Sequence, residues 1–166
     1  MRIFGLAGWS GSGKTTLMTR LIPEFVARGV SVSTIKHAHH SFDIDQPGKD
    51  SWRHRQAGAQ EVMVASAHRW ALMRELRGAA EPSLDELIDR MGRVDLVVVE
   101  GFKRHAHPKI EVYRRTLGKP LLHPHDPHIV AIAADEMLPK FSVPSLPLSD
   151  PRAIADFVLR HEGIAR

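Results

Sequence analysis

The sequence predicts an α/β fold in which a mostly parallel sheet is flanked by helices. One observation is the glycine-rich stretch GWSGSGKTT at residues 8–16, which lies between an apolar run and the start of a helical pattern. Another is that predicted strands alternate with predicted helices after this stretch. A third is the nearly continuous apolar run at residues 94–99, typical of a central parallel strand buried on both faces. Together they predict a P-loop NTPase-like domain that binds its ligand at the carboxyl ends of the strands.

The composition is that expected of one globular domain over residues 1–166. The chain contains no cysteine, which excludes disulfides and thiolate metal sites. No stretch is long and apolar enough to span a membrane, and the first apolar run is too short for a signal peptide. We therefore expect a cytoplasmic protein with no membrane partner.

The formal charge of +4 is unevenly distributed along the chain. Residues 103–119 contain six Lys or Arg and one acid, Glu111. Such a run is typical either of a solvated face or of a basic surface for phosphates. We expect no nucleic-acid partner, because neither aromatic interleaving nor a recognition motif accompanies the charges.

The first elements surround the glycine-rich stretch. Residues 2–7 form a short apolar run suited to a buried strand, and the helix after the stretch is expected to end at Gly29. Pro23 removes one backbone hydrogen bond from this helix and is expected to bend it. Residues 30–35 alternate β-branched and small side chains, which predicts the second strand.

A long polar loop opens the middle of the chain. It covers residues 37–50, and loops of this length in compact domains are usually functional or disordered. Ser51 is expected to cap a short helix over residues 51–57. Residues 60–65 and 69–73 then predict two strands with a tight connection.

The second half continues with strand and helix signals. Ser83 and Glu86 form a capping box that opens a helix with one apolar stripe. Asp150 and Pro151 open the last helix as its cap and first-turn residue. Between these helices, strands are predicted at residues 94–99, 109–113, 129–133 and 145–148.

The glycine-rich stretch fits the phosphate-binding loop pattern, in which two separated glycines precede a lysine and a hydroxyl residue. Its glycines let several N–H groups and the positive end of the next helix face one anion. Lys14 is expected to reach the β- and γ-phosphates, and Thr15 to offer a hydroxyl to Mg²⁺. The predicted nucleotide-binding residues of this loop are Gly8, Ser10, Gly11, Ser12, Gly13, Lys14, Thr15 and Thr16.

Carboxylates follow two of the predicted strands. Asp43 and Asp45 come after the second strand, and Glu100 ends the apolar strand at residues 94–99. Mg²⁺ on a nucleotide is usually held by one or two carboxylates together with phosphates and water. The preferred metal set is Thr15, Asp45 and Glu100, with Asp43 in reserve.

Lys36 ends the second strand and is expected to add a second cation beside the transferring phosphate, although a solvated lysine fits the sequence equally well. Lys14, Lys36 and Asp45 are thus the residues expected to carry phosphoryl chemistry. His37, His39 and His40 lack the helical spacing of a zinc site and are expected to line the phosphate end instead.

Asp135 follows the predicted strand at residues 129–133. A carboxylate at this place can accept hydrogen bonds from N1–H and the 2-amino group of guanine, a match that adenine does not offer. The usual Asn/Thr-Lys-x-Asp guanine pattern is missing from the sequence. Asp135 is therefore the candidate for base recognition, on its position alone.

Several stretches resemble one family, the molybdopterin-guanine dinucleotide biosynthesis adapter proteins, which are GTP-binding partners of molybdenum cofactor guanylyltransferase. The resemblance runs almost from end to end. Its carriers are the phosphate-binding loop, IKHAHH at residues 35–40, FDIDQPGKDS at residues 42–51, RWALM at residues 69–73 and VVEGFK at residues 98–103.

This resemblance implies a GTP-binding, slowly GTP-hydrolysing homodimer that assists the attachment of GMP to molybdopterin. It also implies that Thr15, Asp45 and Glu100 hold Mg²⁺. Ala134 stands where relatives often carry serine, which is a departure beside Asp135. The alternative is a P-loop kinase that acts on a pterin or another small metabolite. The loop at residues 37–50 is expected to become ordered when Mg²⁺ draws in Asp45, which places His39 and His40 over the phosphates.

Overall fold

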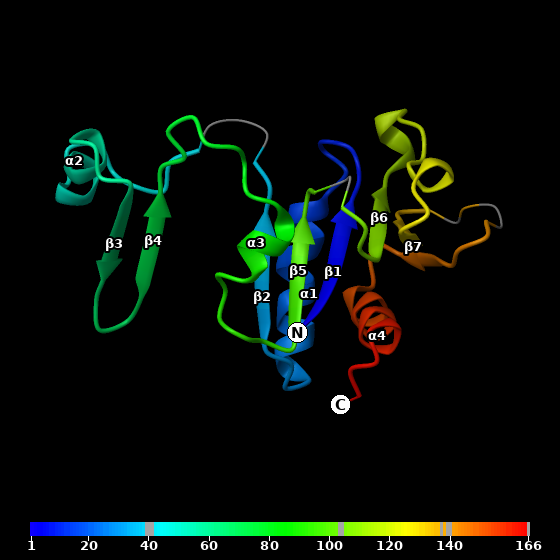
Figure 1. Ribbon diagram of the computed structural model, residues 1–166. Helices are drawn as coiled ribbons and strands as arrows, with labels where there is room; N and C mark the ends of the chain where they lie inside the picture. The colour runs from blue at the N-terminus through cyan, green and yellow to red at the C-terminus, as the bar shows by residue number, and fades with distance from the viewer. Residues whose placement is uncertain (39–41, 103–104, 137, 139–140, 166) are drawn as a thin grey trace. The chain divides into compact units, whose positions relative to one another are not determined.

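The computed structural model describes residues 1–38, 42–102, 105–136, 138 and 141–165. The chain divides into two compact units (Figure 1). Unit 1 consists of Met1–His37 and Gly92–Arg166, and unit 2 is Ala38–Met91. One domain over residues 1–166 stays a prediction. Within the described ranges, no helix has the length and apolar character needed to cross a membrane.

Unit 1 is built on a six-stranded parallel sheet, as the sequence predicts. The strand order is β2-β5-β1-β6-β7-β8, so β5 lies between β1 and β2. In the register, Glu100 is opposite both Leu6 and Lys36, which brings the carboxyl ends of these three strands to one level. The strands are β1 Arg2–Ala7, β2 Val32–Lys36, β5 Leu96–Glu100, β6 Lys109–Tyr113, β7 Ile129–Ala134 and β8 Ser145–Pro147.

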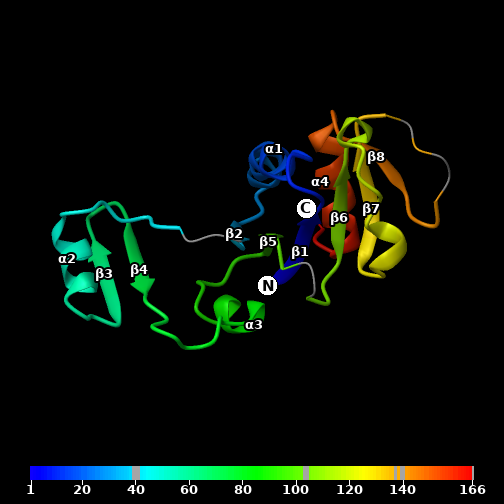
Figure 2. The ribbon, with the colours of Figure 1, turned by 90° about the horizontal axis from the view of Figure 1, so that it is seen from above.

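The core of unit 1 lies between this sheet and two helices, α1 (Lys14–Ala27) and α4 (Pro151–His161). The helices pack against each other, and Figure 2 shows the sheet edge-on beside them. Alternate strand residues such as Phe4 and Ile110 are fully buried there, because successive side chains of a strand point to opposite faces. Helix α1 includes Pro23, and the side chain of Asp150 caps α4 by accepting a hydrogen bond from Ala153 N at 3.0 Å.

Unit 2 contains α2 (Asp50–Gln56), the antiparallel hairpin of β3 (Glu61–Ala65) and β4 (Trp70–Arg74), and α3 (Leu84–Ile88). The predicted capping box of α3 is confirmed. The predicted Ser51 cap of α2 is wrong. Lys49 occupies the cap position, and the Ser51 hydroxyl instead donates a hydrogen bond to the Asp45 carboxylate at 2.8 Å.

Candidate functional site

The phosphate-binding loop connects β1 to α1 at the carboxyl edge of the sheet. Gly8 and Gly13 have φ angles of 142° and 97°, which only glycine adopts without strain. A Cβ atom on Gly8 would lie 2.6 Å from the carbonyl oxygen of Val112, so the loop also approaches β6 too closely for a side chain. A glycine-rich turn that leads directly into a helix is the arrangement in which backbone N–H groups bind phosphate.

Lys14 lies across this loop. Its ammonium donates hydrogen bonds to the carbonyl oxygens of Gly8 and Trp9, both at 2.9 Å. These contacts hold the cation over the loop backbone, where it can reach phosphate oxygens. The other predicted loop residues divide by exposure: Ser10, Thr15 and Thr16 are exposed, whereas the Ser12 side chain is buried against Gly8. Ser12 can therefore offer its main chain to a ligand, but not its hydroxyl.

The structure brings Thr15 and Glu100 together. The Thr15 hydroxyl lies 3.0 and 3.1 Å from the two carboxylate oxygens of Glu100, and it donates to this carboxylate. The Lys36 ammonium lies 4.0 Å from the same carboxylate and is 62% exposed. A hydroxyl and a carboxylate beside the phosphate loop are oxygen donors of the kind that Mg²⁺ prefers. Their role as metal ligands stays a prediction.

Asp45 lies in unit 2, within a cluster of charged side chains. Its carboxylate accepts hydrogen bonds from Ser51 Oγ at 2.8 Å and Arg55 Nε at 3.2 Å. Arg55 also pairs with Asp43 and Glu75, each at 2.7 Å. The guanidinium lowers the pKa of Asp43 below its usual value. Asp45 as third magnesium ligand stays a prediction, and no three His, Asp or Glu of the described residues form a metal site.

The segment at residues 114–126, which follows β6, covers one side of the phosphate loop. The Arg114 Nε donates to the carbonyl oxygen of Ser12 at 3.1 Å, and the Trp9 indole donates to the carbonyl oxygen of Pro120 at 2.8 Å. Leu117 Cδ2 would lie 3.6 Å from a Cβ atom on Gly11. These contacts could not be predicted from local patterns, because they join residues about a hundred positions apart.

Buried charges anchor this covering segment. Glu111 is 0% exposed, and its carboxylate accepts hydrogen bonds from the backbone N–H groups of Leu122 and His123, both at 2.8 Å. Burial raises the pKa of Glu111. Lys109 is 1% exposed and pairs with Asp126 at 3.2 Å. Lys109 is therefore part of neither a solvated face nor a basic surface, the two alternatives for residues 103–119, and Arg114 and Arg115 of this run pair with Asp135 and Glu136.

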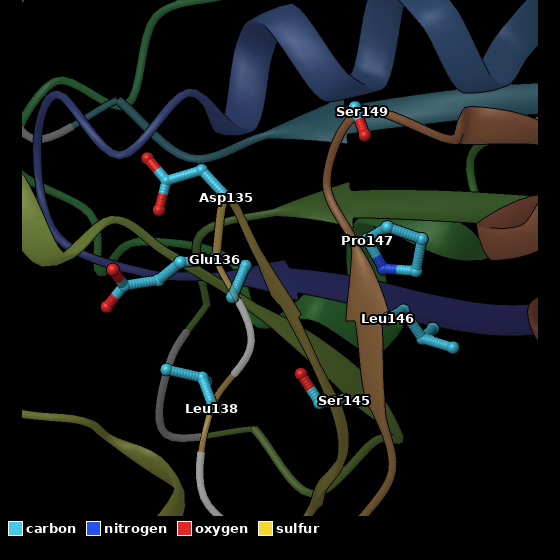
Figure 3. A pocket seen from close by; sticks show the side chains of 8 residues that line it. Asp135, Glu136, Leu138, Ser145, Leu146, Pro147 and Ser149 are labelled. Atoms are coloured by element: carbon cyan, nitrogen blue, oxygen red, sulfur yellow. The ribbon is translucent and has the colours of Figure 1, made fainter.

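Asp135 lies at the carboxyl end of β7, beside a pocket of about 420 Å³ (Figure 3). One of its carboxylate oxygens accepts a hydrogen bond from Arg114 Nη1 at 3.1 Å. The pocket lies between the chain after β7 and the strand β8, where Figure 3 shows Ser145, Leu146 and Pro147. Its remaining lining residues are Ala134, Glu136, Leu138 and Ser149.

The predicted histidines fall partly outside the structure. His39 and His40 are outside the described residues. His37 follows β2, and its backbone N–H donates to the carbonyl oxygen of Glu100 at 2.8 Å. Its ring lies 4.9 Å from that of Phe102, centroid to centroid. His37 therefore lies at the same sheet edge as Glu100.

The chain matches the sequence model of Molybdopterin guanine dinucleotide synthesis protein B, or MobB, over residues 3–135. It belongs to the MobB family. The molybdopterin-guanine dinucleotide biosynthesis adapter protein of Escherichia coli is 44% identical over 160 residues, which cover 95% of this chain and 91% of that protein. The adapter protein of Haemophilus influenzae is 43% identical, over 94% of this chain and 86% of that protein.

Solved MobB structures have the same fold. The crystal structure of molybdopterin-guanine biosynthesis protein B superposes with a TM-score of 0.77 at 30% identity, over 97% of this chain and 99% of that one. Bacillus subtilis MobB superposes with a TM-score of 0.76 at 25% identity, over 98% of both chains. The α/β, P-loop NTPase-like fold is therefore confirmed.

Proposed function

We propose that this chain is a GTP-binding adapter in the conversion of molybdopterin to its guanine dinucleotide form. The MobB family places it in this biosynthesis. The observation that supports nucleotide binding is the phosphate loop itself, with Lys14 held over the backbone and the Thr15 hydroxyl beside Glu100. The names of the relatives, which call them adapter proteins, support a role beside another enzyme of this pathway.

Each residue has a distinct task in this proposal. The loop N–H groups and the Lys14 ammonium bind the triphosphate, and the Asp135 carboxylate binds guanine beside the pocket. Thr15 and Glu100, with Asp45 as a further ligand, would hold Mg²⁺, which neutralises charge on the phosphates. Lys36 adds a cation at the same edge. GTP hydrolysis is slow and secondary to the adapter role.

The proposed partners are molybdenum cofactor guanylyltransferase, molybdopterin and a second copy of this chain. Unit 2 offers a surface for the second copy. Met63, Trp70 and Leu72 share one face of the β3–β4 hairpin, and they are 62%, 66% and 43% exposed. An exposed apolar face on a two-stranded sheet is typical of an interaction site, because such a sheet is marginally stable alone. We place the protein in the cytoplasm.

The test is a titration of the protein with GTP and with ATP in the presence of Mg²⁺. We expect GTP to bind more tightly than ATP. Addition of the protein and GTP to the guanylyltransferase should then increase formation of the dinucleotide cofactor. Equal binding of both nucleotides contradicts the guanine preference. Transfer of label from γ-labelled GTP to molybdopterin would instead identify a kinase.

A further inference from the structure

Arg114 connects two parts of the proposed nucleotide site. Its Nε donates to the carbonyl oxygen of Ser12 in the phosphate loop, at 3.1 Å. Its Nη1 donates to the Asp135 carboxylate beside the pocket, also at 3.1 Å. One planar guanidinium thus spans from the phosphate loop to the candidate base-binding carboxylate, and its donors are rigidly placed with respect to one another.

The contact with Ser12 bears on the direction of a loop N–H group. The peptide between Ser12 and Gly13 is planar and trans, so its carbonyl oxygen and its N–H point in opposite directions. Because Arg114 lies on the side of the Ser12 oxygen, the Gly13 N–H points away from Arg114. A Cβ atom on Gly13 would lie 3.5 Å from Arg114 Nε and Nη2, so the guanidinium also lies against this residue.

The contact between Arg114 and Asp135 affects recognition of the base in the proposed nucleotide site. The guanidinium fixes the position of one of the carboxylate oxygens. An ionised carboxylate accepts both hydrogen bonds from the edge of guanine, whereas adenine presents an acceptor and a single amino group there. An Asp135 carboxylate held in place by Arg114 therefore discriminates between the bases more strongly than a freely rotating side chain would.

We infer that Arg114 is a positioning and specificity-determining residue that couples phosphate binding to guanine recognition. The inference rests on the proposed function and adds a residue to it. Arg114 contacts the loop through a main-chain carbonyl and the base site through a carboxylate. Loss of the hydrogen bond to Ser12 or of the one to Asp135 leaves the guanidinium less fixed. The group at its other end is then held less firmly as well. Binding of the triphosphate chain and selection of guanine then depend on the same side chain.

The neighbouring residue provides a matched control. Arg115 pairs with Glu136 at 3.1 Å, one position along from the Arg114–Asp135 pair on both sides. Its side chain is 75% exposed, whereas that of Arg114 is 38% exposed. Removal of Arg115 therefore tests the loss of an arginine and an ion pair without the link to Ser12.

The experiment compares Arg114→Met with Arg115→Met in the full chain. Titration calorimetry with Mg²⁺ measures the affinities for GTP, ATP and inorganic triphosphate, which has the phosphate chain but no base. We expect Arg114→Met to lower the affinity for inorganic triphosphate by about tenfold and the ratio of GTP to ATP affinity by about tenfold. An effect of this size is typical for the loss of a hydrogen bond from a charged group. Arg115→Met should change neither by more than about twofold.

A double-mutant cycle tests the route to the base. Asp135→Asn should lower the GTP-to-ATP ratio about as much as Arg114→Met, and the double variant should lower it no further. Arg114→Lys keeps the charge but lacks the forked donors of arginine, so it should also reduce the preference for GTP over ATP. Circular dichroism checks that this variant retains the fold. Additive losses, or an effect of Arg114→Met on only one of the two affinities, would overturn the coupling.

Failure of the inference differs from failure of the proposed function. If the parent protein binds neither GTP nor inorganic triphosphate, the proposed function is wrong. If the parent prefers GTP and Arg114→Met behaves like Arg115→Met, only the coupling role of Arg114 is wrong.

Discussion

Lys14 illustrates how a single residue is prepared for its ligand. Its ammonium already has two carbonyl partners in the loop, those of Gly8 and Trp9. A phosphate bound in the loop replaces neutral acceptors with charged oxygens, and hydrogen bonds between charged groups are stronger. Lys14 should therefore contribute to affinity rather than to stability.

The first prediction concerns the contribution of Lys14 to GTP affinity. Lys14→Ala should weaken GTP binding by about 1.5–3 kcal/mol, because it removes the cation from the phosphate site. Calorimetric titration measures the loss, and thermal unfolding checks that the fold persists. Arg160→Ala, at an exposed cation in the last turn of α4, is the control and should bind as the parent does. Unchanged affinity of Lys14→Ala would place the nucleotide elsewhere.

His107 is a buried residue with a consequence for pH dependence. It is 4% exposed, and burial together with the nearby Lys109 and His105 lowers its pKa to about 4, while Asp126 acts in the opposite direction. The unfolded chain binds this proton below about pH 6.5, and the folded chain only below about pH 4. Acidification through this window therefore favours unfolding.

The second prediction is that His107→Gln removes part of the acid sensitivity of the protein. In the parent, this histidine should lower the free energy of unfolding by up to about 1.4 kcal/mol per pH unit between pH 6.5 and 4. Urea denaturation across this range measures the slope. Glu111 acts with the opposite sign, since burial raises its pKa, and only the difference between variant and parent isolates His107. His68→Gln, in the exposed hairpin turn, should keep the parent slope.

Among the elements, the loop between β2 and α2 combines structural and proposed functional roles. Arg55 on α2 ties Asp43 and Asp45 of this loop to Glu75 after β4. A carboxylate that binds Mg²⁺ must exchange its arginine partner for the metal. Both aspartates pair with Arg55, but only Asp45 is the preferred metal ligand. A comparison of variants at the two positions therefore distinguishes the loss of an ion pair from the loss of a metal ligand.

The third prediction compares Asp45→Asn with Asp43→Asn. Both variants weaken the arginine cluster, but only Asp45→Asn should abolish the effect of Mg²⁺ on GTP affinity, because it removes the charge that the metal needs. Hydrogen exchange over residues 42–50 should show protection by Mg²⁺ and GTP in the parent and in Asp43→Asn. Equal protection in Asp45→Asn would mean that this loop is not coupled to the metal.

At the scale of the whole molecule, the two units separate the proposed tasks. Lys14, Glu100 and Asp135 belong to unit 1, and the exposed face of the β3–β4 hairpin belongs to unit 2. Changes to the hairpin face should therefore leave nucleotide binding unaltered, whereas Asp45, which also belongs to unit 2, is a proposed Mg²⁺ ligand.

The fourth prediction concerns association of two copies. Sedimentation should give twice the 18.6 kDa mass of the chain for the parent. Leu72→Lys places a charge directly opposite Met63 and two positions from Trp70 on the hairpin face, and it should produce a monomer that binds GTP with unchanged affinity. Arg74→Lys, on the same strand, is the control. A monomeric parent, or a dimeric Leu72→Lys variant, would contradict this use of the hairpin.

Local patterns predicted much of the fold and part of the site. The phosphate loop, the strand before it and the Ser83 capping box depend on residues close in sequence, so the pattern alone was sufficient. Arg114 was missed, because its partners Ser12 and Asp135 come from distant segments. The sequence predicts a helix cap at Ser51, because a local pattern does not show that the hydroxyl donates a hydrogen bond to Asp45 instead.

The insertion of unit 2 into unit 1 has a consequence for the order of folding. Strands β2 and β5 are neighbours in the sheet, with Lys36 opposite Glu100, yet all of Ala38–Met91 lies between them in the chain. The contacts of the β3–β4 hairpin are local, and hairpins close in microseconds. Early formation of the hairpin shortens the free chain that must close before β2 pairs with β5, which reduces the entropy lost in that step. Early folding of the inserted segment thus limits the entropy cost of assembling the edge at which Lys36 and Glu100 meet.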